Sequence, residues 1–188
     1  MPGRPQRAGP LPARGRAVGV THEPSYEQLA ERVRRLEDLR AVEALAARYH
    51  HLCDGGWHGP SHENLDALVA LWVPDGVYRI NPQRPPCRGH AEIRAQFERL
   101  RTSMPWIFHT FTNSDVTVHD DDASGTFKGI AYYRRGGGAH IVVGTYSGRF
   151  RRTPQGWRFV SWTADLAHGS VLSAEKGVAV DAENGASR

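Results

Sequence analysis

Two residues far apart in the chain, Asp54 and His109, are of the types that together form a general-base pair. Asp54 ends the segment Leu36 to Asp54 (LEDLRAVEALAARYHHLCD), and His109 lies in the segment WIFHTFTNSDV. A carboxylate that accepts a hydrogen bond from one imidazole nitrogen fixes the tautomer and raises the basicity of the other nitrogen. If the fold brings the two side chains together, His109 is placed to remove a proton from a bound substrate.

The segment that ends at Asp54 has the spacing of an amphipathic helix, with apolar residues at intervals of mostly three and four. These residues are Leu36, Leu39, Val42, Leu45, Ala46, Tyr49, Leu52 and Cys53. Gly55 and Gly56 predict the end of the helix. The negative end of the helix dipole disfavours a carboxylate there by roughly 0.3–1 kcal/mol. Asp54 is therefore either a solvated turn residue or the partner of a cation or an imidazole.

His109 belongs to a segment with the period-two pattern of a strand. Alternation places Ile107, His109 and Phe111 on one face, so the imidazole points the same way as apolar neighbours. A histidine in this setting is either a hydrogen-bonded core residue or a base. A nearby carboxylate such as Asp54 favours the second interpretation.

Helices are predicted before strands along the chain. We expect a helix from Tyr26, capped by Ser25 with Gln28 in the capping-box position, which bends or breaks before Leu36. Shorter helices are expected over 64–72 and 89–100, with a turn at 74–76 and a strand from 77 to 80. After these, strands are expected over 106–119, 125–135, 139–152 and 157–166, the first of them bent near Asn113. This order predicts an α+β domain whose helices cover one face of a curved antiparallel sheet.

Composition predicts one soluble domain. The chain has 188 residues, of which 39% are hydrophobic and 23% charged, enough for a sizeable core. The net charge of +4 equals the charge of residues 1–20, so the remainder is neutral and lacks the basic surface of a nucleic-acid-binding protein. We assign 1–24 to a disordered basic tail, 25–168 to the folded domain and 169–188 to a flexible tail.

The chain also lacks signals for membranes and secretion. No run approaches the eighteen or so apolar residues of a membrane span, and no apolar stretch of a secretory signal begins the sequence. Cys53 and Cys87 are expected to be unpaired thiols in a reducing environment. We therefore predict a cytoplasmic protein that does not bind a membrane.

The succession of motifs resembles the SnoaL-like branch of the nuclear transport factor 2 (NTF2) superfamily. It comprises a helix with Tyr-x4-Asp, then LWVPDGVY, RGHAEIRAQF and HTFTN, and a meander ending GTYSGRFRRTPQGWRFVSWT, over roughly residues 27–168. Within the branch it is similar to the group of scytalone dehydratase, bile acid dehydratase and hexachlorocyclohexane dehydrochlorinase. The resemblance implies a cone-shaped barrel of curved antiparallel sheet closed by N-terminal helices, an internal pocket, no cofactor, and assembly as a homodimer or homotrimer.

The resemblance also implies roles for residues. Asp54 would orient the general base His109, and Tyr49 would stabilise a developing oxyanion or assist a departing hydroxide. The implied reaction is a dehydratase-type elimination. Alternatives are an isomerase or polyketide cyclase with the same base, and a non-catalytic subunit like the β subunits of ring-hydroxylating dioxygenases. The 125–135 segment lacks the second histidine of scytalone dehydratase, which leaves the leaving group open.

Aromatic residues of the barrel region are expected to line the pocket, and Arg149 is the counterpart of arginines in other members of the branch. The expected substrate contacts are Trp57, Trp72, Tyr78, Phe111, Tyr132, Tyr146 and Arg149. A pocket of this composition suits a flat apolar substrate, polycyclic or polyketide-like. No metal site is expected, because glycines break the four-residue spacing of His50, Asp54, His58 and His62.

Overall fold

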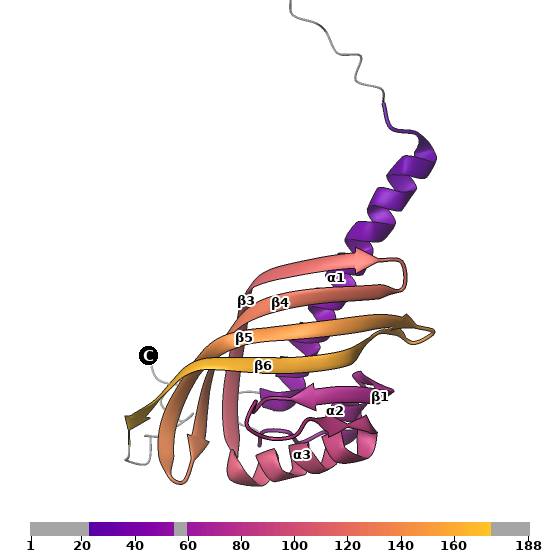
Figure 1. The fold of residues 1–188 in the computed structure, drawn as a ribbon. Helices are drawn as coiled ribbons and strands as arrows, with labels where there is room; N and C mark the ends of the chain where they lie inside the picture. The colour runs from indigo at the N-terminus through magenta and orange to yellow at the C-terminus, as the bar shows by residue number, and fades with distance from the viewer. Residues whose placement is uncertain (1–22, 55–59, 174–188) are drawn as a thin grey trace, which may run out of the picture.

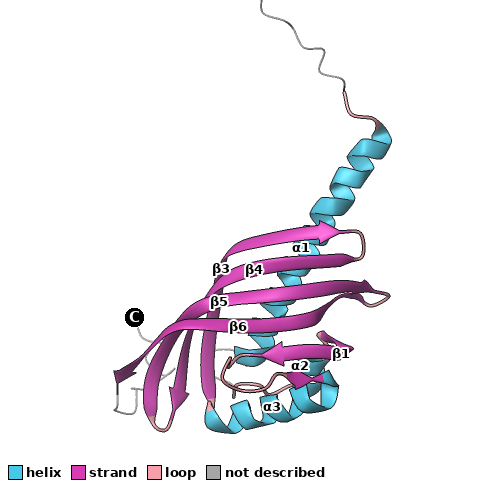
Figure 2. Ribbon diagram, viewed as in Figure 1, coloured by secondary structure: helices cyan, strands magenta, loops and turns pink. Residues whose placement is uncertain are grey.

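The computed structural model describes residues 23–54 and 60–173. Within them the elements run in the order α1 (Tyr26–Asp54), α2 (Leu65–Val69), β1 (Trp72–Arg79), β2 (Cys87–Arg88), α3 (Gly89–Ser103), β3 (Trp106–His119), β4 (Asp122–Arg135), β5 (Gly138–Thr153) and β6 (Gly156–Ser173). The predicted α+β class, with helices first and a strand meander after them, is confirmed (Figure 2).

The strands form one curved sheet in the order β2-β1-β6-β5-β4-β3. Neighbouring strands are antiparallel except β1 and β6, which are parallel. The helices lie on the inner side of the curve, and the described strands do not close into a barrel (Figure 1). As a result β3 is an edge strand, which leaves the space between β3 and α1 accessible from one side.

Helix α1 is one uninterrupted element, so the break that was one of the two possibilities predicted before Leu36 is not present. The helix contains no glycine or proline between Tyr26 and Asp54, and sharp kinks require such residues or an inserted group. Its start follows the predicted capping box: the Ser25 N–H donates to Gln28 Oε1 (2.9 Å) and the Gln28 N–H donates to Ser25 Oγ (3.2 Å). None of the described helices, α1 included, carries an apolar run able to cross a membrane.

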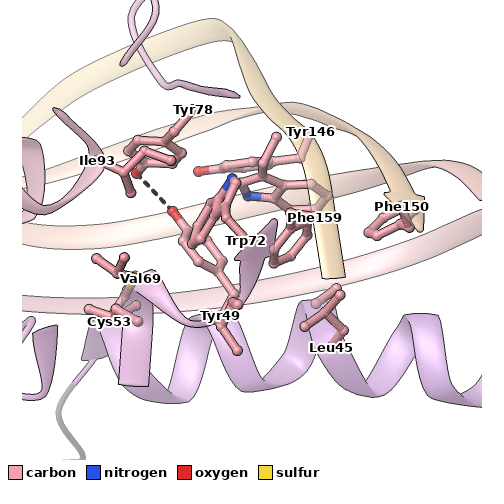
Figure 3. Packing of buried hydrophobic residues seen from close by; sticks show 14 of the residues in the cluster. Leu45, Tyr49, Cys53, Val69, Trp72, Tyr78, Ile93, Tyr146, Phe150 and Phe159 are labelled. Carbon is pink, nitrogen blue, oxygen red and sulfur yellow. Dashed lines mark hydrogen bonds between the residues drawn. The ribbon is translucent and has the colours of Figure 1, made fainter. Parts of the chain in front are cut away.

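The core lies between α1, α3 and the concave face of the sheet. Its largest buried side chains are aromatic, and Figure 3 shows Tyr49 of α1 packed among residues of β1, β5 and β6. Trp72, Phe159 and Trp162 are each no more than 2% exposed. Burial of aromatic groups on this scale fixes the position of α1 against the sheet.

Three predicted features differ from the structure because tertiary pairing overrides local pattern. The predicted helix over 64–72 ends at Val69, and β1 already begins at Trp72. The predicted turn at 74–76 is an irregularity inside β1, where the register with β6 shifts between Trp72 and Val77. Strand β6 reaches Ser173 through its pairing with β5, so residues 169–173 belong to the sheet and not to the predicted tail.

Candidate functional site

The predicted acid, Asp54, is the last residue of α1, and it contacts the predicted imidazole, His109, on the edge strand β3. Asp54 Oδ1 lies 2.6 Å from His109 Nδ1, and Asp54 Oδ2 accepts a hydrogen bond from the His109 backbone N–H at 3.0 Å. The side chains are only 12% and 6% exposed for Asp54 and His109, respectively. The carboxylate is thus bound by both the main chain and the side chain of one residue, which fixes the imidazole in rotation and position.

This geometry assigns different roles to the two ring nitrogens of His109. A carboxylate can only accept hydrogen bonds, so Nδ1 carries the hydrogen in the contact with Asp54. In the neutral ring Nε2 then holds the lone pair. The arrangement can accept a proton at Nε2 and stabilise the resulting imidazolium through Asp54.

Both residues line a cleft of about 440 Å³ between α1 and β3. Both apolar and polar residues of α1 and β3 line its walls. The lining residues are Arg40, Glu43, Ala46, Ala47, His50, His51 and Asp54 from α1, Trp106, Ile107, Phe108, His109, Phe111, Thr112, Asn113 and Ser114 from β3, and Phe127 from β4. A cleft of this volume accommodates a small organic molecule.

The far end of the cleft is shaped by a break in β3 at the predicted place. The register of β3 with β4 shifts between Thr112 and Asp115, and Asn113 has a φ of 51°. Asparagine tolerates this left-handed conformation better than most residues. Within the break, the Ser114 hydroxyl donates to Glu43 of α1 at 2.7 Å, which ties the strand to the helix across the cleft.

His50 is part of the site, although the sequence analysis gave it no role there. Its ring stacks on that of His109, with centroids 4.9 Å apart and planes 5° from parallel. Burial, followed by the proximity of His109, lowers the pKa of His50 to about 2, so it stays neutral at physiological pH. The available signal was its position one turn before Asp54, which puts both on one face of α1.

Tyr49 lies behind the cleft and not in it. Its hydroxyl is 3.0 Å from that of Tyr78 (Figure 3), the residue is 2% exposed, and it does not line the cleft. Burial raises the pKa of both tyrosines well above the usual range. In this structure the Tyr49 hydroxyl is directed at Tyr78, and its expected role toward a substrate oxyanion stays a prediction.

The expected substrate contacts divide into four groups, of which Tyr132 and Arg149 form the last. Phe111 lines the cleft. Trp72, Tyr78 and Tyr146 are 2%, 1% and 6% exposed and pack in the core, because the aromatic cluster fills the inside of the curve. Trp57 lies outside the described residues.

Tyr132 and Arg149 are on the wrong face of the sheet for a role in the cleft. Buried and exposed residues alternate along β4 and β5, and inward positions include Ala131 and Phe150. Tyr132 and Arg149 are their direct neighbours and so point outward. Neither lines the cleft, which corrects the prediction for both.

The described residues offer no evident metal site. Among residues 23–54 and 60–173, no group of three or more His, Cys, Asp or Glu side chains is arranged to hold a metal ion. His58, which belonged to the four-residue spacing noted in the sequence, lies outside these ranges. The polar side chains that line the described cleft carry imidazole, carboxylate, guanidinium, hydroxyl and amide groups.

Comparisons with known proteins agree with this architecture. The family model of the SnoaL-like domain matches residues 34–163. An NTF2-like protein with a cystatin-like fold from Novosphingobium aromaticivorans is 30% identical, with a TM-score of 0.65, over 79% of this chain and 94% of that one. None of the curated proteins compared with the chain matches it.

Two further solved structures are similar. A protein of the same organism described as a candidate aromatic ring hydroxylase is 29% identical, with a TM-score of 0.65, over 72% of this chain and 94% of that one. A type 2 hexachlorocyclohexane dehydrochlorinase (LinA) has a TM-score of 0.69 at 14% identity, over 80% of this chain and 99% of that one. The second likeness is one of fold alone.

Proposed function

We propose that this chain, which belongs to the SnoaL-like domain family, is a cofactor-free lyase of the dehydratase type. The observation that carries the proposal is the contact of Asp54 with His109 Nδ1 at 2.6 Å, in the wall of a cleft large enough for a small molecule. A pair of this kind inside the hydrophobic core would serve packing. At a cleft it can exchange a proton with a ligand.

The reaction begins with removal of a proton from carbon by His109 Nε2. The electron pair of the broken C–H bond forms a C=C bond while a hydroxide or other leaving group departs from the neighbouring carbon. Asp54 accepts the hydrogen bond of Nδ1–H and stabilises the positive charge on the ring. General-base catalysis of this type contributes about 10²–10⁴-fold to the rate.

Neutral His50 supports the same step. Because its pKa is lowered to about 2, it adds no positive charge beside His109 when the latter takes up a proton. Its parallel stacking at 4.9 Å also restricts rotation of the His109 ring. The base therefore starts the reaction in the geometry that it needs.

The lining of the cleft indicates the substrate class. Trp106, Ile107, Phe111 and Phe127 present apolar and aromatic surface, whereas Arg40 and Asn113 add polar groups. Such a site fits a flat apolar molecule, polycyclic or polyketide-like, with a carbonyl that acidifies the neighbouring C–H. Both described cysteines are free, which is compatible with action in the cytoplasm.

The experiment is a screen of fused-ring β-hydroxyketones with mass-spectrometric detection, with wild type and His109→Ala in parallel. Dehydration yields a product lighter by one water, and isomerisation yields a product of unchanged mass. We expect loss of water with the wild type and none above background with His109→Ala. Turnover by both proteins alike would contradict the proposal. Product of unchanged mass would make the protein an isomerase, and absence of any conversion would favour a non-catalytic subunit.

A further inference from the structure

The N-terminal part of α1 exposes a row of large apolar residues. Tyr26, Leu29, Val33 and Leu36 are 86%, 45%, 53% and 65% exposed, and we call them the N-terminal stripe. This end of the helix, indigo in Figure 1, extends past the sheet. Scattered exposed apolar side chains are common, but a continuous row on one helix face marks an interaction surface.

The N-terminal stripe is not covered by the domain to which α1 belongs. Leu45, which is buried in the core, follows Leu36 by about two and a half helical turns and so points in the opposite direction. Asp38, also buried, points to the same side as Leu45 and contacts Arg152 of β5. The described part of the chain leaves the stripe uncovered, and β3 reaches this side of α1 only farther along, where the Ser114 hydroxyl donates to Glu43.

The spacing of the stripe is that of a coiled-coil seam. Its residues are separated by three, four and three positions, which puts Tyr26 and Val33 at heptad positions a, and Leu29 and Leu36 at positions d. The next a and d positions are Arg40 and Glu43, which line the cleft. The apolar seam therefore ends where the cleft begins.

The flanking charges select the partner and its direction. In this register Arg32 is at position g and Glu37 at position e, and both are exposed. A parallel, in-register pair of identical helices sets position g of one helix against position e of the other. Each Arg32 would then face Glu37 of the second copy, whereas an antiparallel pair would bring like charges together.

We propose that the N-terminal stripe binds a second copy of this chain as a parallel two-helix coiled coil. The stripe lies on the end of α1 that extends past the sheet (Figure 1), where the described part of the chain leaves it exposed to a second copy. The seam is short, and interfaces below about 1,200 Å² are weak. We expect a dissociation constant on the order of 10 μM.

Sedimentation velocity of the full chain, from about 1 to 200 μM, tests the proposal. We expect a concentration-dependent dimer in the wild type. The double variant Val33→Glu, Leu36→Glu should weaken the dimer on the order of 100-fold, because it places charges in the apolar seam. Arg35→Glu, exposed on the same helix but outside the seam, should dimerise like the wild type. A wild type that is monomeric throughout, or a double variant that still dimerises, would overturn the proposal.

Charge exchange tests the parallel register with proteins whose apolar seam is intact. Arg32→Glu and Glu37→Arg should each weaken the dimer, and their combination should restore the wild-type dissociation constant. Leu36→Cys should form a disulfide between copies under mild oxidation, since identical d positions face each other, and Arg35→Cys should not. A combined variant no tighter than the single variants, or equal cross-linking of both cysteine variants, would exclude this register.

Discussion

Helix α1 has two aspartates that are buried to a similar extent but differ in role. The difference comes from their hydrogen-bond partners. As whole residues, Asp38 and Asp54 are 7% and 9% exposed. Both accept hydrogen bonds from a strand of the sheet. Asp38 is held by Arg152, whose Nη1 and Nη2 donate to Oδ1 and Oδ2 at 2.6 Å each. Asp54 is held by His109.

The two pairs differ in what their proton donor can do. The Arg152 guanidinium stays protonated at any physiological pH, it lies over the Trp157 ring at 4.7 Å, and the Trp157 Nε1–H also donates to Asp38. The hydrogen bonds from Arg152, the largest cause, lower the pKa of Asp38. That cluster can only clamp α1 to the sheet, whereas an imidazole can release and take up a proton. The comparison therefore separates a structural carboxylate from one suited to catalysis.

The largest expected effect is the loss of the base. We predict that His109→Ala slows elimination of 5-nitrobenzisoxazole, a flat aromatic carbon acid, by about 10²–10⁴-fold. His119→Ala, an exposed residue at the other end of β3, is the matched control and should keep the wild-type rate. If the spectrophotometric rate fell equally in both variants, His109 would not be the specific base of the reaction.

Next in size is the loss of the structural clamp. Asp38→Asn should reduce the free energy of unfolding by about 1.5–3 kcal/mol, because the Arg152 guanidinium, about one-third exposed, loses its hydrogen bonds to this carboxylate and, among the described residues, keeps only Asp121 as a countercharge. Asp115→Asn, at an exposed position of β3, is the control and should reduce the free energy of unfolding by less than about 0.5 kcal/mol. Urea denaturation measures both. A loss at Asp38 no larger than that of the control would show that the cluster is not a clamp.

Two buried histidines make stability depend on pH. Burial lowers the pKa of His50 to about 2 and that of His62 to about 3. As the pH falls below about 6.5, these two histidines therefore bind protons in the unfolded chain but not in the folded one. Stability is thus highest above this value and decreases toward the folded pKa values, by up to about 1.4 kcal/mol per pH unit for each histidine.

The second histidine allows this dependence to be divided. His62 has a φ of 56°, which asparagine tolerates, so His62→Asn should remove roughly half of the loss in unfolding free energy between pH 7 and 5 that these two histidines cause. Urea denaturation at both pH values measures it. An unchanged pH dependence would mean that His62 is not protonated selectively in the unfolded state.

The smallest effect is expected for Tyr49. Because its hydroxyl contacts Tyr78 and not the cleft, Tyr49→Phe should change the elimination rate less than about threefold and cost about 1 kcal/mol of stability through one lost buried hydrogen bond. Tyr78→Phe should behave in the same way. A rate loss of 10²-fold or more for Tyr49→Phe alone would return Tyr49 to the oxyanion role that the resemblance implied.

The sequence predicted those features that depend on local periodicity. The 3.6-residue pattern put Asp54 at a helix end, and alternation along 106–119 put His109 on the inward face. The succession of motifs indicated the SnoaL-like family, which the family model confirms. These features follow from the order of residues within single elements.

Features that depend on packing between elements were missed. The stacking of His50 on His109 requires α1 to pack against β3. The residue pattern within either segment does not predict the distance between the two elements. Tyr132 stands beside a second tyrosine at 133, so aromatic character alone did not tell which of them faces inward. Trp72 and Tyr78 were expected at the pocket, but the aromatic cluster fills that space.

The most direct test of the central claim compares the two aspartates in one assay. Elimination rates of 5-nitrobenzisoxazole should be measured for Asp54→Asn and Asp38→Asn at a temperature where both variants remain folded. We predict that Asp54→Asn slows the reaction by at least about 10-fold, because His109 loses its orienting carboxylate, while Asp38→Asn leaves the rate unchanged. Equal rates in the two variants would contradict the assignment of Asp54 and His109 as a general-base pair.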